Sequence, residues 1–381
     1  MLRSLFIAAF CVCALFNSQA GQTFADDKHV AALLPELHLL EPAISSPIIH
    51  RESSILLKMT ADGPLTARLA FPADEILEVS TATRQHRFEL GKDCTLMSDK
   101  QTLVFSNPGP IVPLSTDDLF PPKDSPNSYR HRASNPEQNM LYRPGKWFHE
   151  RNVEITYRRS PVSQQLPRIT DLLPKTIARL KAGEPFTLGI SGDSISTGLD
   201  ASGLFQAPPL QPGYPDLVAA QLQTTCGSKI NLKNRAVSGW SVATGLNDLD
   251  KLLAEKPQLI IVAYGMNDVG RRDPKWFHTQ TKTFIERVHA ADPSIELILV
   301  SPMLGNSEWV HTPREMFAKY RDELRSLTGP GIALADVTLA WEIMLKHKHD
   351  LDLTGNGLNH PNDFGHRLYA QTILSLLVKQ P

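Results

Sequence analysis

Polar residues with the chemistry of acyl transfer follow an apolar run in the second half of the chain. The run begins at Phe186 and ends abruptly in Gly192-Asp193-Ser194. We expect it to be a buried strand that delivers Ser194 to the rim of a sheet, where a hydroxyl can act as a nucleophile. The alternative is an ordinary turn, because Gly, Asp and Ser are common turn residues.

Two further segments offer hydrogen-bond donors. The segment Asn234-Arg-Ala-Val-Ser-Gly239 follows a second strand-like run, and Tyr264-Gly-Met-Asn267 follows a third. Acyl transfer needs donors aimed at the oxygen that becomes negative, and the Gly239 N–H and the Asn267 amide suit that role beside the Ser194 N–H. The structural alternatives are that Gly239 only permits a tight turn and that Asn267 caps a following segment.

A base is offered by His360, near the C-terminus. It precedes a helical pattern whose first turn is signalled by Asn362 and Asp363, so its ring is a candidate to take the Ser194 proton. His366, about a turn into that helix, is predicted to be a packed structural histidine.

The segments that hold these residues alternate between strand-like and helical patterns. Strand-like runs fall at 186–190, 229–232, 258–263, 296–300 and 332–335, and helical patterns at 216–224, 243–254, 275–290, 313–327 and 363–377. This alternation predicts a parallel sheet with helices on both faces. Ligands of such sheets bind beyond the carboxyl ends of the strands, where the polar segments fall.

The N-terminal part of the chain has a different pattern. Short strand-like runs lie at 54–59, 65–71, 76–79, 87–90, 95–97, 102–105 and 153–157, with a turn-rich hairpin junction at 61–64 and no helical run between them. They predict a small β-sandwich. The proline-rich stretch 107–143 is predicted to be a long irregular excursion over its surface that reaches toward the second domain. We therefore expect a signal peptide at 1–20, an all-β sandwich at 27–160 and a parallel-sheet, three-layer, flavodoxin-like domain at 168–381.

The order of the polar segments resembles a known family. A Ser after the first strand, a Gly after the second, Gly-x-Asn after the third and a His before the last helix resemble the SGNH hydrolases, also called the GDSL esterase and lipase family. The resemblance covers about residues 185–377. It implies that Ser194 is the nucleophile, His360 the general base, and the Gly239 N–H with the Asn267 side chain the oxyanion hole, without a metal or organic cofactor. The Gly-x-Ser-x-Gly elbow of the α/β-hydrolase fold is not matched, because Ser196 replaces its second glycine.

The chain departs from the family at one position. An acid usually stands about three residues before the histidine and orients it, whereas this chain has Gly357 there. The candidates to replace it are a backbone carbonyl, the Asn356 side chain, and Asp350 or Asp352 folding back from upstream. We favour the first two, because the glycines around Asn356 let the loop bend toward the ring and a neutral acceptor still fixes the tautomer. A neutral partner predicts a slower enzyme or a catalytic dyad.

The composition and the N-terminal sequence limit the molecules that this protein is expected to bind and the place where it is expected to act. The 381 residues carry a net charge of -1 with both signs mixed, which disfavours binding to nucleic acid or to an anionic membrane. Residues 1–20 have one positive charge, a short apolar core and small residues at Ser18 and Ala20, the layout of a secretory signal peptide. We therefore expect an exported protein without stable membrane insertion; an uncleaved anchor is the alternative. Cys94 and Cys226 are expected to be free or buried thiols, with a disulfide between them left open.

The resemblance also suggests a substrate. A β-sandwich ahead of the hydrolase domain is similar to the layout of carbohydrate esterases in the family, which implies an acetylated carbohydrate. The alternatives are a short-chain lipid or general esterase, and a non-catalytic glycan-binding protein that keeps the fold. The segment 347–350, with His347 and His349, is interpreted as a solvated helix end and not as a metal site.

Overall fold

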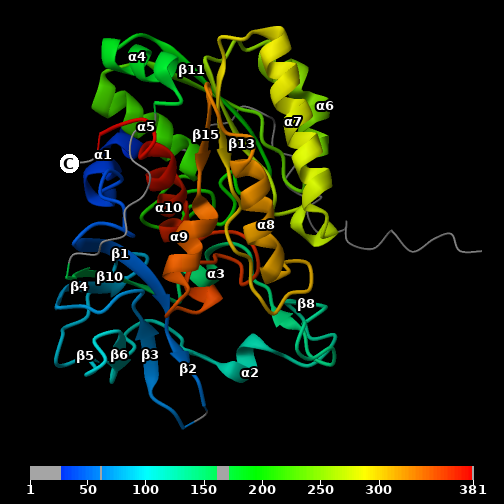
Figure 1. Ribbon diagram of the computed structural model, residues 1–381. Coiled ribbons are helices and arrows are strands. Elements are labelled where there is room, and N and C mark those ends of the chain that lie inside the picture. Colours follow the sequence, from blue (N-terminus) through cyan, green and yellow to red (C-terminus); the bar gives the residue numbers. More distant parts are fainter. Residues whose placement is uncertain (1–26, 61, 161–170, 380–381) are drawn as a thin grey trace, which may run out of the picture.

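The computed structural model describes residues 27–60, 62–160 and 171–379. The N-terminal residues form mainly a β-rich half and the C-terminal residues an α/β half, drawn at the bottom and top of Figure 1. The signal peptide predicted at 1–20 lies outside the described residues, and so does most of the linker expected near 159–167. Export therefore stays a prediction.

The C-terminal half is built on a five-stranded parallel sheet, which confirms the predicted fold. Its spatial order is β12-β11-β13-β14-β15, with β11 (Phe186–Gly192), β12 (Ile230–Asn234), β13 (Leu259–Ala263), β14 (Glu296–Val300) and β15 (Ile332–Ala335). The first strand thus lies inside the sheet, between the second and the third. This is the 2-1-3-4-5 order of doubly wound sheets, whose ligands bind where the order reverses, beyond the end of β11.

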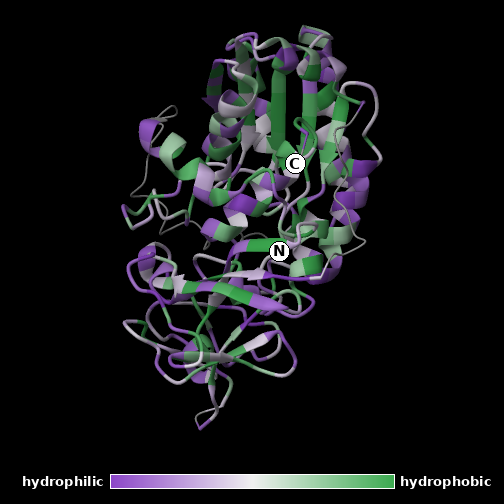
Figure 2. Ribbon diagram, turned by 90° about the vertical axis from the view of Figure 1, so that its left-hand side faces the viewer, coloured by the Kyte–Doolittle hydropathy of each residue, from purple (hydrophilic) through white to green (hydrophobic). Residues whose placement is uncertain are grey.

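Helices cover this sheet, so its central strands are largely apolar. The helices are α4 (Pro174–Ala182), α5 (Tyr214–Cys226), α6 (Val242–Leu253), α7 (Pro274–Ala291), α8 (Arg314–Arg325), α9 (Val337–Met344) and α10 (Asp363–Leu374). Helix α7 packs against α6 and α8, while α5 packs against α10. Every residue of β13 and β14 is buried, as expected for a parallel sheet covered on both faces. Figure 2 shows these strands as an apolar layer inside helices with polar outer surfaces.

Two helices of this half were not expected. The α9 sequence, VTLAWEIM, is apolar on almost every side, so it lacks the helical alternation of apolar and polar residues. The α4 helix follows the expected linker and begins with Pro174 in its first turn.

The N-terminal half is a β domain of mainly antiparallel sheets, as expected. One sheet has the order β1-β10-β4 and a second has β5-β6-β3-β2-β7. The strands are β1 (Ile48–Ile55), β2 (Leu57–Lys58), β3 (Leu65–Arg68), β4 (Glu75–Thr81), β5 (Cys94–Leu96), β6 (Thr102–Phe105), β7 (Leu114–Ser115) and β10 (Asn152–Arg158). The predicted hairpin pairs Leu57 with Thr66. The run 87–90 forms only isolated bridges.

The expectation of no helix in this region is wrong. Helix α1 (Asp27–Leu37) precedes the first strand and packs against α5 of the other half. Its apolar residues Val30, Leu33, Leu34 and Leu37 are buried, a helical spacing that the strand-based interpretation of this region passed over. Two short helices, α2 (Thr116–Leu119) and α3 (Lys146–His149), lie farther along.

The proline-rich excursion runs onto the C-terminal half. It carries a small hairpin of β8 (Ser128–Tyr129) and β9 (Met140–Leu141). The Ala133 N–H donates to the Glu308 carbonyl, and Arg132 forms an ion pair with the Glu308 side chain. The two halves are thus joined by hydrogen bonds as well as by packing.

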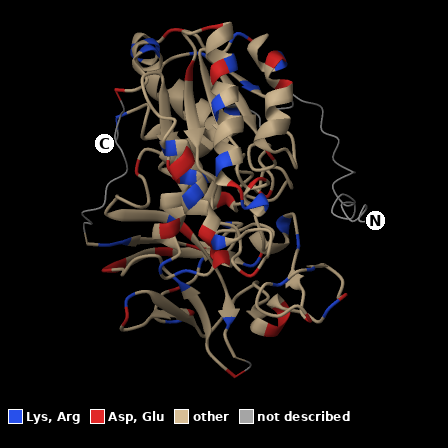
Figure 3. Cartoon of the chain, turned by 45° about the vertical axis from the view of Figure 1, so that its right-hand side comes forward, with Lys and Arg blue, Asp and Glu red and all other residues tan. Residues whose placement is uncertain are grey.

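The surface is mixed in charge. Lys and Arg alternate with Asp and Glu over the outer helices and loops in Figure 3, which agrees with the net charge of -1. Within the described ranges, no helix is both long and apolar enough to cross a membrane. Cys94 and Cys226 are both free thiols, as expected.

Candidate active site

Ser194 lies on the tight turn that follows β11. The Leu199 N–H donates to the Ser194 carbonyl, and the Asp193 side chain accepts from the Ile195 N–H at 3.0 Å. A side chain at Gly192 would overlap Ser196, so this turn requires a glycine there. Ser194 is thereby presented at the carboxyl end of β11, with 5% of the residue exposed.

His360 contacts Ser194 directly. Its Nε2 lies 3.0 Å from Ser194 Oγ, and its Nδ1 lies 2.7 Å from Oδ2 of Asp200. Because the Asp200 carboxylate accepts the Nδ1–H, Nε2 is left free to accept the hydroxyl proton. Asp200, His360 and Ser194 thus form the acid-base-nucleophile arrangement that recurs on unrelated hydrolase folds.

The acid at His360 is not one of the predicted residues. We favoured a backbone carbonyl or the Asn356 side chain, with Asp350 or Asp352 as the further candidates. The Asp352 carboxylate instead accepts from the Ile55 N–H at 2.8 Å and from the His349 N–H at 2.8 Å. It joins β1 to the loop before His360, so the expectation that Asp352 orients the ring is wrong.

Asn356 does lie beside the ring, with its Nδ2 2.9 Å from His360 Nδ1. Its Oδ1 accepts from the Leu358 and Asn359 N–H groups, so the side chain shapes the loop that carries the histidine. Since the Nδ1–H is directed to Asp200, the Asn356 amide is a neighbour of this hydrogen bond and not its acceptor. Asp350, the other upstream candidate, pairs with Arg314 and accepts from Ser307.

Asp200 was missed because it belongs to the nucleophile loop. It follows Ser194 after one short turn, and the family pattern directs the search to the residues just before His360. One signal was available: Gly198-Leu-Asp200 allows a left-handed turn, and Gly198 and Asp200 have φ values of 83° and 65°. A carboxylate in such a turn comes back toward the strand end.

His366 holds the backbone next to Asp200. Its Nε2 lies 3.1 Å from the Leu199 carbonyl oxygen, and its Nδ1 accepts from the Tyr214 N–H at 3.3 Å. Burial lowers the pKa of His366 to about 4, so the neutral ring donates on one side and accepts on the other. The prediction of a packed structural histidine is confirmed.

The predicted donors Gly239 and Asn267 come together on the loops that flank Ser194. Strand β11 pairs with β12 on one side and β13 on the other. The Asn267 amide donates to the Trp240 carbonyl at 2.9 Å, which joins the two loops and leaves its second N–H available. Within the described chain, the N–H groups of Gly239 and Ser194 donate to no protein atom, so both remain available to an oxyanion.

Two buried carboxylates support these loops. Asp268 accepts from the Val242 and Gly265 N–H groups at 3.2 and 3.1 Å, and burial raises its pKa to about 7. Burial likewise raises the pKa of Asp193 to about 6. Backbone N–H groups offset part of the cost of this burial, at both oxygens of Asp268 and at Oδ1 of Asp193.

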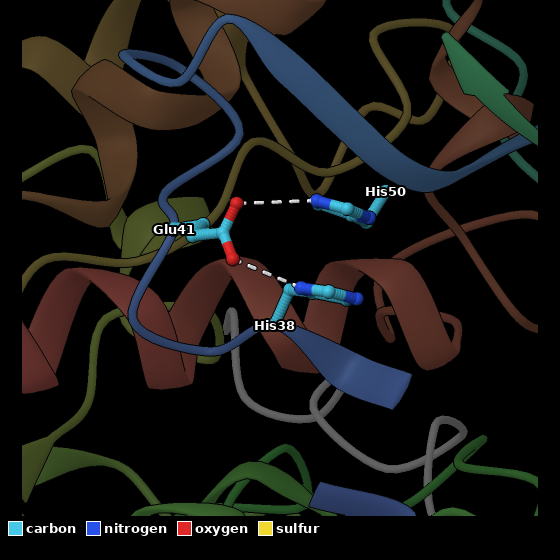
Figure 4. Close-up of side chains that lie close together, drawn as sticks. All are labelled: His38, Glu41 and His50. Atoms are coloured by element: carbon cyan, nitrogen blue, oxygen red, sulfur yellow. Dashed lines mark hydrogen bonds and ion pairs between the residues drawn. The ribbon is translucent and has the colours of Figure 1, made fainter. Parts of the chain in front are cut away.

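A second cluster of titratable residues lies away from this site, where α1 meets β1 (Figure 4). Glu41 accepts from His38 at 3.0 Å and from His50 at 3.2 Å. These three side chains are potential metal ligands. The imidazole rings, however, are stacked at 3.4 Å and only 6° from parallel, whereas two imidazoles on one metal ion approach it from different directions. The geometry is that of a carboxylate shared by two histidines.

The sheet order and the polar loops at its carboxyl edge define an SGNH-type hydrolase domain. Residues 190–368 match the GDSL-like Lipase/Acylhydrolase family. This part of the chain is thus a domain of the GDSL ester hydrolases, which confirms the predicted class of enzyme.

Comparison with known proteins gives remote similarities. Among curated proteins no sequence matches. An alpha/beta hydrolase enzyme from the metagenome of Lake Arreo, Spain, is 22% identical over 51% of this chain and 96% of its own, with a TM-score of 0.42. An acetylxylan esterase from Geobacillus stearothermophilus is 20% identical over 52% of this chain and 96% of its own, with a TM-score of 0.42. A two-domain esterase active on acetylated mannans is 21% identical over 57% of this chain and 56% of its own, with a TM-score of 0.42.

Proposed function

We propose that this enzyme hydrolyses an ester through an acyl-enzyme formed on Ser194. The observation that carries the proposal is the continuous line of contacts from Ser194 Oγ through His360 to the Asp200 carboxylate, at 3.0 and 2.7 Å. In the first step His360 Nε2 takes the hydroxyl proton while Oγ attacks the ester carbonyl. The Asp200 carboxylate stabilises the imidazolium that forms.

The carbonyl oxygen becomes negative in this step. The free N–H groups of Ser194 and Gly239 and the second N–H of Asn267 are the proposed donors to it. His360 then gives its proton to the leaving alcohol, and the acyl group remains on Ser194. A water molecule, deprotonated by His360, releases the acid and restores the serine.

We propose an acetylated carbohydrate as the substrate. Among the residues that the structure describes, exposed large apolar residues do not gather at the active site: Met59, Leu77, Leu90, Met97 and Val112 belong to the β domain, and only Val310 to the hydrolase domain. A lipid-binding surface would need a contiguous apolar patch there. Partly exposed aromatic rings instead lie where the proline-rich excursion meets the hydrolase domain: the ring centroid of Tyr129 lies 5.4 Å from that of Tyr142 and 5.3 Å from that of Trp309. Such rings suit a ligand that has both apolar faces and hydroxyl groups.

The non-catalytic alternative loses its main support. It rested on the missing acid, and Asp200 offers a carboxylate at the required atom of His360. A short-chain general esterase remains the second candidate within the same chemistry.

One experiment separates these candidates. Rates are measured on aryl esters of rising acyl length and on acetylated xylan, for the wild type and for Ser194→Ala. We expect acetate to be released from xylan, rates that fall as the acyl chain lengthens, and loss of activity in Ser194→Ala. Equal rates in the two proteins would exclude the serine mechanism, and activity on aryl esters without acetate release from xylan would favour the general esterase.

We also propose that the protein is exported after cleavage near Ala20. The support is the signal-peptide layout of residues 1–20. Mass spectrometry of the mature protein, isolated from outside the cytoplasm of the producing cell, is expected to show a start close to Gly21. An intact N-terminus in the cytoplasmic fraction would contradict export.

A further inference from the structure

The excursion of the β domain ends at the proposed catalytic residues. The Arg143 N–H donates to the Asn356 carbonyl at 3.2 Å, and the Gly145 N–H donates to Oδ1 of Asp200 at 3.0 Å. A segment that the sequence places in another domain therefore touches both the acid and the loop that carries the base.

The residues after Gly145 anchor this segment. His149 hydrogen-bonds to the Pro208 carbonyl at 2.7 Å, and the Phe148 side chain is fully buried. A methyl group at Gly357 would lie 2.9 Å from that ring, which shows how closely the segment packs against the histidine loop. The backbone is thus fixed both before and after Gly145, which keeps its N–H in place.

The backbone conformation of Gly145 is one that only glycine adopts readily. Its φ of 93° and ψ of -157° lie in a region that costs a residue with a side chain on the order of 1–3 kcal/mol. The space around it is open enough for a methyl group, because the nearest atom, in the Phe205 ring, would be 3.7 Å away. The requirement for glycine at this position therefore comes from the backbone conformation, which directs the N–H to Asp200, and not from a lack of space for a side chain.

We propose that Gly145 is a positioning residue for Asp200, so that the β domain is a working part of the catalytic site. Asp200 is 5% exposed, and each of its oxygens has a separate partner: Oδ1 the Gly145 N–H, Oδ2 the Nδ1 of His360. The first bond stops the carboxylate from rotating away from the ring. The proposal rests on the ester hydrolase function above, and Gly145 acts only through Asp200.

A positioning role predicts a specific kinetic effect. Loss of the Gly145 contact leaves the binding surface intact but lets the acid turn, so kcat falls while KM is unchanged. We expect a fall of about 10- to 100-fold, the scale of a misplaced catalytic group. We expect no such fall in kcat in a variant that lacks the Asp200 carboxylate, because Gly145 then has nothing to position.

The test is a double-mutant cycle between Gly145→Ala and Asp200→Ala. Gly91→Ala is the matched control, because Gly91 also has a positive φ, of 86°, with no neighbour within 4 Å of an added methyl group, and lies in the β domain away from the site. Each protein is assayed with an aryl acetate, and kcat is divided by the fraction of active sites that a first-turnover burst or a serine-directed phosphonate titrates.

We expect Gly145→Ala to lower kcat per active site in the wild-type background and to change nothing in the Asp200→Ala background, with Gly91→Ala at the wild-type rate. In proton NMR the downfield resonance of the His360 Nδ1–H is expected to shift in Gly145→Ala and not in Gly91→Ala. An equal fall in both backgrounds, or a wild-type rate in Gly145→Ala, would overturn the proposal. Failure of the proposed function itself is distinguishable, because Ser194→Ala would then retain activity.

Discussion

Asp200 and His360 are 160 residues apart in the chain, and their side chains meet at 2.7 Å. The acid that would orient the histidine thus comes from the loop of the nucleophile instead of the loop of the base. A loop that already presents Ser194 needs only one left-handed turn to bring Asp200 behind the ring.

Removal of the Asp200 carboxylate is expected to lower kcat strongly. Without it His360 loses both its orientation and the charge that stabilises the imidazolium, an effect of about 10²- to 10⁴-fold. The measurement is kcat and KM on an aryl acetate for Asp200→Asn and Asp200→Ala. The matched control is Asp352→Asn, which is expected to lower the melting temperature while keeping the rate per active site, because Asp352 supports β1. A low kcat in Asp352→Asn together with a normal kcat in Asp200→Asn would instead support Asp352, a candidate from the sequence, as the acid that orients His360.

Asn267→Ala tests the oxyanion donors. The variant loses a side-chain N–H that we expect to bond only the charged transition state, so kcat should fall about 10²- to 10³-fold with little change in KM. Asn359→Ala serves as the comparison, since its side chain contacts Asn356 and is not assigned to the oxyanion. A larger change in KM than in kcat would show that Asn267 binds the ground state instead.

Acidification is expected to destabilise the protein through the cluster of His38, Glu41 and His50. Burial, and then the neighbouring His38 ring, lower the pKa of His50 from 6.5, while the Glu41 pKa is lowered from 4.5 because the hydrogen bonds and charges of the two histidines outweigh burial. As the pH falls, the unfolded chain therefore binds protons before the folded chain does. The free energy of unfolding begins to fall as the pH drops below about 6.5, and it falls further as Glu41 becomes protonated. Urea unfolding at pH 7 and pH 5 checks this.

The variant for this experiment is His50→Gln, which is expected to lose less stability between pH 7 and pH 5 than the wild type. The exposed His347→Gln is the control and should follow the wild type. A His50→Gln protein with the full wild-type pH dependence would contradict the role of the cluster.

Lys348→Met is expected to loosen the junction of the two halves. Lys348 Nζ lies 2.7 Å from Glu52 Oε1, and both side chains are fully buried. Removal of one partner leaves a buried charge, which costs about 3–5 kcal/mol. Thermal and urea unfolding of Lys348→Met and of the exposed Lys346→Met give the comparison. The double variant Lys348→Met with Glu52→Gln is expected to regain part of the lost stability, because the second substitution removes the unpaired charge. No recovery would mean that the loss of stability comes mainly from packing and not from the unpaired charge.

Much of the fold followed from local patterns in the sequence. The strands of the parallel sheet and their order along the chain were predicted almost residue by residue, because strands covered on both faces, such as β13, are largely apolar. The segments with Ser194, Gly239, Asn267 and His360 were found because each directly follows a strand or precedes a helix. Helix α1 was missed, since short strand-like runs dominate the region around it.

The identity of the acid and the contribution of the β domain depended on the tertiary structure. Asp200 and His360 meet because α10 packs against α5 and brings its preceding loop over the nucleophile turn. Gly145 meets Asp200 because the excursion is anchored by buried side chains such as Phe148. Sequence patterns report which face of an element is buried, whereas contacts between distant loops are set by how whole elements pack. Residue types and their order thus determined the class of chemistry, and packing decided which carboxylate and which backbone N–H complete the site.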